Sequence, residues 1–242
     1  MTELLIRQFP CLQDNYGFLV HEPVSGETAC IDTPDADRIQ YEAEKAGWTI
    51  TQIWNTHHHF DHAGGNLALK AATGARIIAP AYDAHRIDGI DVEVREGDTV
   101  QLGEASAKVL HTPGHTTGHV VYWFEDQNTA FVGDTLFALG CGRLFEGTPA
   151  DMFKSLSRLA AMPDKTTLYC AHEYTQANAK FALSIDPDNP ALQRYSREVD
   201  ARRARGEATV PTTLGKEKEA NPFLLARTAE DFAEARAQKD RF

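Results

Sequence analysis

The sequence lacks long apolar runs, and its N-terminus lacks the features of an export signal. Its longest unbroken apolar run, Val120–Phe124, is far shorter than the roughly 20 residues that cross a bilayer. The first ten residues, MTELLIRQFP, contain no apolar core of the roughly 7–15 residues found in secretory signals. We therefore expect a cytoplasmic protein that neither spans nor binds a membrane.

Paired cysteines are also absent. The four cysteines, Cys11, Cys30, Cys141 and Cys170, lie far apart and form no CxxC pair. This spacing is typical of neither a small disulfide scaffold nor a thiolate zinc site. We expect four buried free thiols.

Basic residues are scarce relative to acidic ones. The chain has 24 Lys and Arg against 35 Asp and Glu, so its net charge is −11. Such a field repels phosphate backbones, which argues against nucleic acid as a partner. The charge is uneven, however, because residues 192–242 contain more basic than acidic residues. Charge alone leaves two interpretations open, an anionic ligand bound by this tail or a solvated helical tail without a role.

The patterning predicts an α/β body followed by a helical C-terminal part. Hydrophobic residues make up 42% of the chain and charged residues 24%, as in globular proteins. Short runs rich in β-branched and aromatic residues predict strands at 17–20, 28–31, 50–54, 76–79, 107–110, 120–124, 129–132 and 167–170. Helix start and stop signals predict helices within 33–47, 66–74 and 148–162, and later over 176–184, 190–205 and 228–239, with a loop between the last two.

A histidine-rich loop follows the predicted strand 50–54. Its sequence, THHHFDHAGG, contains an HxHxDH pattern formed by His57, His59, Asp61 and His62. In an extended backbone His57 and His59 point the same way, whereas Asp61 and His62 lie beyond a turn. The pattern therefore predicts ligands for two metal ions rather than for one.

Three further candidate ligands each follow a predicted strand: His115, Asp134 and His172. An assignment that balances the two shells gives His57, His59 and His115 to the first metal and Asp61, His62 and His172 to the second. Asp134 would bridge the two ions, because a carboxylate offers two oxygens and an imidazole cannot bridge. This mixed shell suits two divalent ions, zinc being the first choice and iron or manganese the alternatives.

The other polar residues of these segments have alternative interpretations. His111 could replace His115 as a ligand. His58, between two ligands, is expected to point away from the metals, and His119 to pack or to support a ligand. Asp32, after strand 28–31, could orient a ligand imidazole or serve at a helix N-terminus.

The motifs THHHFDHAGGN, HTPGHTTGH, GDTLFALGCGRLFEG, AHEYTQAN and the closing KDRF together resemble the metallo-β-lactamase superfamily and, more narrowly, the glyoxalase II or hydroxyacylglutathione hydrolase family. The resemblance implies an αββα hydrolase domain in residues 1–173 and a small helical glutathione-binding domain in residues 174–242. It implies the same seven metal ligands. It also implies hydrolysis of S-(2-hydroxyacyl)glutathione, such as S-lactoylglutathione, to glutathione and a 2-hydroxycarboxylate, the second step of methylglyoxal detoxification. We expect a monomer.

The resemblance also implies four glutathione contacts. Arg143 matches a basic residue near the glycyl part, and Tyr174 matches a tyrosine beside the thiol. Arg236 and Lys239 match a pair that holds the glutathione carboxylate. Some family members have tyrosine where this chain has Phe145, so one hydroxyl contact is missing here.

The expected chemistry starts from a hydroxide that bridges the metals, because bound metal lowers the pKa of water to about 7. Asp61 and Asp134 are the expected catalytic carboxylates through the metals that they hold. A thiolate leaves without protonation more readily than an amine, so a thioester suits this site better than an amide. A glutathione persulfide dioxygenase with one iron, a β-lactam hydrolase and a purely structural metal-binding module are the alternatives.

Overall fold

The computed structural model describes residues 3–242 of the chain. The chain divides into two compact units, Met1–His111 with Gly118–Gln127 and Thr112–Thr117 with Asn128–Phe242. Each unit contains strands and helices. The division into domains 1–173 and 174–242 stays a prediction.

The first unit contains a six-stranded sheet in the order β1-β2-β3-β4-β5-β6. Neighbours from β1 to β3 are antiparallel, and neighbours from β3 to β6 are parallel. A second group of strands, β7 to β9, pairs antiparallel. The strands are β1 Leu5–Cys11, β2 Asn15–His21, β3 Thr28–Ile31, β4 Ile50–Trp54, β5 Arg76–Pro80, β6 Val92–Val94, β7 Thr99–Leu102, β8 Ala105–His111 and β9 Val120–Phe124.

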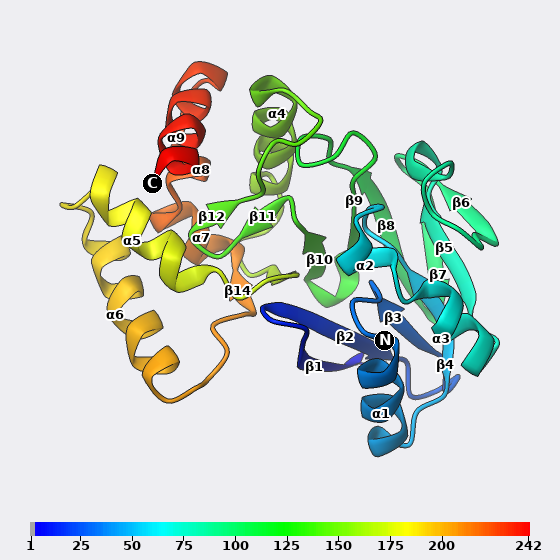
Figure 1. The fold of residues 1–242 in the computed structure, drawn as a ribbon. Coiled ribbons are helices and arrows are strands. Elements are labelled where there is room, and N and C mark those ends of the chain that lie inside the picture. The colour runs from blue at the N-terminus through cyan, green and yellow to red at the C-terminus, as the bar shows by residue number, and fades with distance from the viewer. Residues whose placement is uncertain (1–2) are drawn as a thin grey trace. The chain divides into compact units, whose positions relative to one another are not determined.

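The helices of this unit are α1 Ala36–Ala46, α2 Phe60–Ala63 and α3 Asn66–Thr73, with the short 3₁₀ helices η1 Ala81–Asp83 and η2 Glu125–Gln127. Asp35 caps α1 by accepting a hydrogen bond from the Arg38 backbone N–H, and Gly47 ends the helix with a φ of 72°, a left-handed conformation that glycine adopts without strain. Helices α1 and α3 pack on the six-stranded sheet through a shared apolar core (Figure 1).

Parallel pairing brings the loops that carry polar side chains to one edge of this sheet. Ile31 pairs with Trp54, and Trp54 pairs with Ile78, so β3, β4 and β5 end beside one another. The Asp32 backbone N–H donates to the Trp54 carbonyl oxygen at 2.9 Å, which continues the ladder one residue past β3. The segments that follow these three strands therefore leave the sheet side by side.

The second unit contains the strands β10 and β13, which pair in parallel, and β14, which pairs antiparallel with β13. Strands β11 and β12 form a short antiparallel ribbon. The elements are β10 Thr129–Gly133, β11 Leu136–Phe137, β12 Gly140–Cys141, α4 Pro149–Ala160, β13 Thr167–Cys170, α5 Thr175–Ile185, α6 Pro190–Ala204, β14 Thr212–Thr213, α7 Leu214–Ala220, α8 Pro222–Leu225 and α9 Ala229–Arg241.

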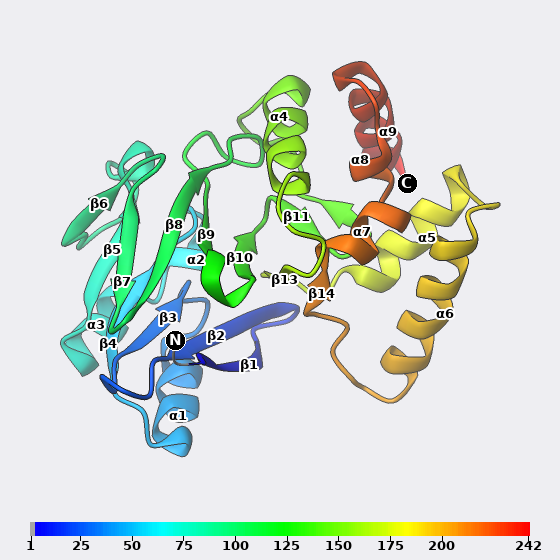
Figure 2. The same cartoon turned by 180° about the vertical axis from the view of Figure 1, so that it is seen from behind.

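Helices dominate the second unit after β13. Helices α5 and α6 lie side by side, as both views show (Figures 1 and 2), and share a core that includes Ala182, Leu192 and Val199. Helices α4 and α9 both begin with a capping box, in which Thr148 or Thr228 exchanges hydrogen bonds with the aspartate three residues later. These paired signals explain why both helices start where the sequence indicates.

Two predictions of local structure are wrong. The histidine-rich segment THHHFDHAGG is expected to be a loop, but it contains the four-residue helix α2. Residues 206–227 were expected to be a loop, but they contain β14, α7 and α8. Helix α7, with the sequence LGKEKEA, spans seven residues and shows no side-chain cap, so neither periodicity nor capping identifies it. The four cysteines are free and buried, as expected. Among the described residues, no helix is long and apolar enough to span a bilayer.

Candidate metal centre

The loop between β4 and α2 places His57 and His59 as a pair. The His57 Nε2 and His59 Nδ1 atoms lie 3.0 Å apart. Two nitrogens bound tetrahedrally to one zinc ion at 2.0–2.1 Å would lie about 3.3 Å apart, so this separation fits a shared cation. The Thr56 hydroxyl lies 3.0 Å from His57 Nδ1, which leaves Nε2 as the ligand atom.

Asp32 orients a histidine of helix α2, His62. Its carboxylate accepts hydrogen bonds from the Thr56 backbone N–H at 2.7 Å and the Thr56 hydroxyl at 2.8 Å, and it lies 2.8 Å from His62 Nδ1. The His62 Nε2 atom is therefore the ligand atom, and it lies 3.4 Å from Asp61 Oδ2. Asn15 donates to the same Asp61 oxygen at 2.9 Å. Of the two interpretations of Asp32, the structure favours the one in which it orients an imidazole.

The second unit brings the other three predicted ligands together. His115 Nδ1 donates to the Arg143 carbonyl oxygen at 2.8 Å, so its Nε2 atom carries the lone pair for a metal. Asp134 Oδ2 lies 3.4 Å from His115 Nε2 and 3.5 Å from His172 Nε2. The separation of two atoms bound to one metal is similar to these distances. One carboxylate oxygen thus lies close enough to share a metal with each of two histidines that the sequence assigns to different metals.

Close packing holds these three ligands. A Cβ added at Gly142 would lie 2.0 Å from the Asp134 carbonyl oxygen and 3.0 Å from His115 Nδ1, so only glycine fits there. The Tyr174 ring stacks parallel on His172 with a centroid separation of 4.8 Å. The Phe145 ring meets His115 edge to face at 5.3 Å. These contacts restrict the rotation of both imidazoles.

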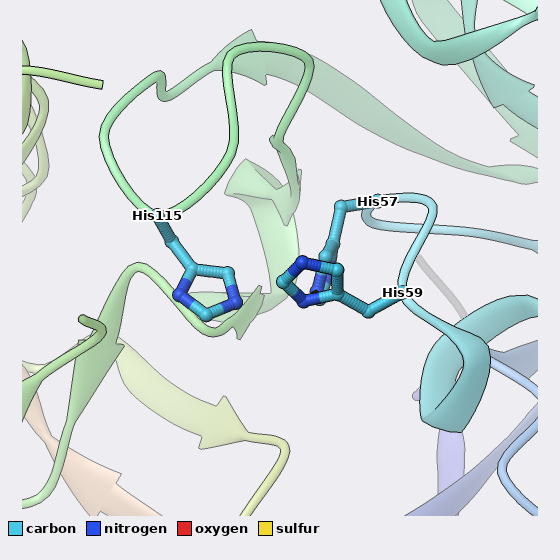
Figure 3. Close-up of side chains that lie close together, drawn as sticks. All are labelled: His57, His59 and His115. Carbon is cyan, nitrogen blue, oxygen red and sulfur yellow. Dashed lines mark hydrogen bonds between the residues drawn. The ribbon is translucent and has the colours of Figure 1, made fainter. Parts of the chain in front are cut away.

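The seven predicted ligands form three groups. Within each group, every ligand atom lies within 4.8 Å of the others. Figure 3 shows three of these side chains, with the rings of His57 and His59, from one loop, facing His115 from another. Imidazole nitrogens with carboxylate oxygens suit a divalent metal such as zinc, iron or manganese. The groups, among the residues that the structure describes, are His57 with His59 and His115, His57 with His62 and Asp134, and Asp61 with His62 and His172.

The alternative histidines have other surroundings. His111 belongs to none of the three groups formed by the described residues, and its ring stacks on Tyr82 at 4.1 Å. His58 Nδ1 lies 3.0 Å from an Asp83 carboxylate oxygen. His119 is buried and stacks on His57 at 4.9 Å, which agrees with a packing role.

The predicted glutathione contacts differ in how they present their charges. The Arg143 side chain is 64% exposed. Arg236 is buried, and its guanidinium donates to Asp240 Oδ1 at 2.8 Å and to the Cys141 carbonyl oxygen at 3.0 Å, so it holds α9 to β12. Burial, followed by the nearby Arg236 and Arg143 cations, lowers the pKa of Lys239 from 10.5 to about 8. The Asp240 carboxylate also lies 3.7 Å from the Arg143 guanidinium, so it contacts both Arg143 and Arg236.

Asn15 and Asp240 orient site groups but are not among the residues expected from the sequence. Asn15, which donates to Asp61, is 46 positions away in the chain, and no local pattern indicates the contact. Asp240 had a detectable signal, because it lies four residues after Arg236, the spacing at which opposite charges meet on a helix.

Comparisons with known proteins identify the family of the chain. Residues 31–172 match the family model of the metallo-β-lactamase superfamily, and residues 173–242 match that of the hydroxyacylglutathione hydrolase C-terminus. A hydroxyacylglutathione hydrolase of Maricaulis maris is 65% identical to this chain, and the match covers 100% of each chain. One of Hyphomonas neptunium is 56% identical, and that match covers 98% of each chain. The crystal structure of ETHE1 from Myxococcus xanthus has a TM-score of 0.75 and 26% identity, over 96% of this chain and 90% of that one.

The expected fold class is therefore confirmed. The chain has the α/β fold of the metallo-β-lactamase type, an αββα sandwich, with a small helical C-terminal region. The resemblance seen in the motifs extends over the whole chain, because the Maricaulis maris relative aligns with all of it. The chain belongs to the hydroxyacylglutathione hydrolase family of the metallo-β-lactamase superfamily.

Proposed function

We propose that this chain is a metal-dependent thioester hydrolase that converts S-(2-hydroxyacyl)glutathione into glutathione and a 2-hydroxycarboxylate. Its support is the full-length similarity to hydroxyacylglutathione hydrolases together with three groups of His and Asp side chains that could hold metal ions. The observation that carries it is the position of Asp134 Oδ2 at 3.4–3.5 Å from both His115 and His172. This arrangement suits a carboxylate shared between two cations.

In this proposal His57, His59 and His115 hold one divalent ion, and Asp61, His62 and His172 hold the other. Asp134 bridges them. When bound, such ions supply hydroxide at neutral pH and stabilise the oxyanion that develops on the acyl carbonyl. Zinc is our first choice for both positions, because it accepts mixed nitrogen and oxygen shells.

The protein residues would bind and orient the thioester. Arg143 and Lys239 would bind the glutathione carboxylates. The Arg143 guanidinium is exposed, and the Lys239 ammonium lies close to Phe181 and Phe242. Tyr174, stacked on His172, would lie beside the sulfur. Arg236 would act through the groups that it holds, because its nitrogens already donate to Asp240 and Cys141. A monomeric state and a cytoplasmic location stay predictions.

A direct test follows free thiol release from S-lactoylglutathione, with oxygen uptake from glutathione persulfide and hydrolysis of a β-lactam as parallel assays. We expect rapid thiol release with negligible oxygen uptake and β-lactam turnover. Oxygen uptake that exceeds thiol release would instead identify a persulfide dioxygenase. Metal binding without turnover of any of the three would favour a structural role for the ions.

Lys239 gives a prediction for pH dependence. Because its pKa is about 8, the free protein loses this positive charge as the pH rises through 8. Binding of the glutathione carboxylate then weakens, so KM should rise up to about tenfold between pH 7 and pH 9. Initial rates with S-lactoylglutathione at several pH values measure this.

Lys239→Arg is the matched control for this effect, since a guanidinium stays protonated throughout that range. Its KM should change little between pH 7 and pH 9, whereas Lys239→Ala should have a raised KM at every pH. An equal rise of KM in the wild type and in Lys239→Arg would remove Lys239 from the substrate site.

A further inference from the structure

The histidine between the two paired ligands is held by a buried aspartate of another loop. Asp83, in η1 after β5, is fully buried. Its Oδ2 atom accepts a hydrogen bond from the His58 backbone N–H at 3.2 Å and lies 3.0 Å from His58 Nδ1. Its Oδ1 atom pairs with Arg86. The carboxylate thus contacts both the backbone and the ring of His58.

The surroundings of Asp83 fix the position of its carboxylate. A Cβ added at Gly118 would lie 2.0 Å from Asp83 Oδ1, so the chain passes this carboxylate without room for a side chain. The pairing of β4 with β5 brings the segment after β5 beside the loop that carries His58. Asp83 is therefore a rigid support next to that loop.

Holding His58 at both backbone and ring also fixes its neighbours. The His58 ring meets the His59 ring nearly edge to face, with centroids 4.8 Å apart, and peptide bonds join His58 directly to both His57 and His59. A fixed His58 therefore limits how both neighbours can move. A rotation of this loop would separate the His57 Nε2 and His59 Nδ1 atoms, which now lie 3.0 Å apart. His62 has a separate support, because Asp32 orients its ring.

We propose that Asp83 is a positioning residue that holds the His57 and His59 imidazoles in chelating geometry through its two contacts with His58. The proposal rests on the metal centre of the proposed function. It assigns Asp83 to the ion held by His57 and His59, whereas Asp32 contacts His62 directly and reaches His57 only through the Thr56 hydroxyl.

The test measures zinc affinity of the metal-free chain by competition with a chromophoric chelator, for the wild type and Asp83→Ala. We expect one of the two zinc equivalents to bind about 10- to 100-fold more weakly in Asp83→Ala, the range found for other outer-shell partners of metal ligands, and the other equivalent to keep its affinity. Excess zinc should restore kcat, and KM for the thioester should stay unchanged.

Asp91→Ala is the matched control, because the Asp91 carboxylate also accepts a backbone hydrogen bond, from Ile77 at 2.8 Å, in the same unit. It should lower thermal stability without changing either zinc affinity. Should Asp83→Ala fail to fold, His58→Ala, which removes the ring contact alone, replaces it and should weaken the same single equivalent.

If Asp83→Ala binds both zinc equivalents with wild-type affinity, or loses affinity equally for both, the positioning role of Asp83 is overturned. Failure of the wild type itself to bind two equivalents would instead overturn the proposed binuclear centre. The two proposals can therefore fail separately.

Discussion

Asp134→Ala should abolish binding of at least one metal ion and lower kcat/KM for S-lactoylglutathione by about 10³-fold or more. Asp134 Oδ2 lies within 3.5 Å of His115 Nε2 and His172 Nε2, and the residue is only 6% exposed. Lewis-acid stabilisation by bound metal contributes several kcal/mol to catalysis, and each 1.4 kcal/mol corresponds to tenfold in rate. Elemental analysis and thiol-release kinetics on the same preparation measure both effects.

Two comparisons separate metal loss from misfolding in this variant. In chelator, the metal-free wild type and Asp134→Ala should melt at similar temperatures, whereas added zinc should raise the melting temperature of the wild type more. Asp164→Ala, which removes an exposed carboxylate paired with Lys218, should keep metal and activity. Full metal content with normal turnover in Asp134→Ala would refute the bridging role.

Glu217→Ala should cost about 3 kcal/mol or more of unfolding free energy, the largest stability effect that we expect from one substitution. The Glu217 carboxylate is fully buried and accepts hydrogen bonds from the Leu139 backbone N–H, the Tyr195 and Thr212 hydroxyls and the Asn221 amide, at 2.7–3.0 Å. Each buried donor left without an acceptor costs about 1–3 kcal/mol. Urea unfolding curves measure the loss.

The conservative variant and a surface control sharpen this test. Glu217→Gln keeps one oxygen acceptor and should cost less than Glu217→Ala. Glu198→Ala removes an exposed carboxylate that pairs with Lys216, and should change stability by about 0.5 kcal/mol or less. A loss below about 1 kcal/mol for Glu217→Ala would mean that the four donors find other partners.

The parts of the fold and site that could be predicted are those encoded over short stretches of sequence. Strands β3, β4 and β13 begin and end where the β-branched runs do. His57 with His59, in the loop after β4, and Asp61 with His62, in helix α2, are close in sequence, so their spacing indicates their geometry. His115 and His172 could be placed near Asp134 because each of the three follows a strand.

The unpredicted features depend on contacts between distant segments or on weak local signals. Asp83 reaches His58 across 25 positions and Asn15 reaches Asp61 across 46, so only the strand pairing brings them together. Helix α7 is short, and its charged sequence shows no apolar stripe. Arg236 was predicted as a glutathione contact, but its burial and its bonds to Asp240 and Cys141 emerge only from the packing of α9.

Titration of the metal-free chain with zinc, with thiol release from S-lactoylglutathione followed at each addition, tests the proposed centre most directly. We predict two tightly bound ions per chain and activity that reaches its plateau at the second equivalent. Saturation at one ion per chain with full activity, or activity that is independent of metal, would contradict it.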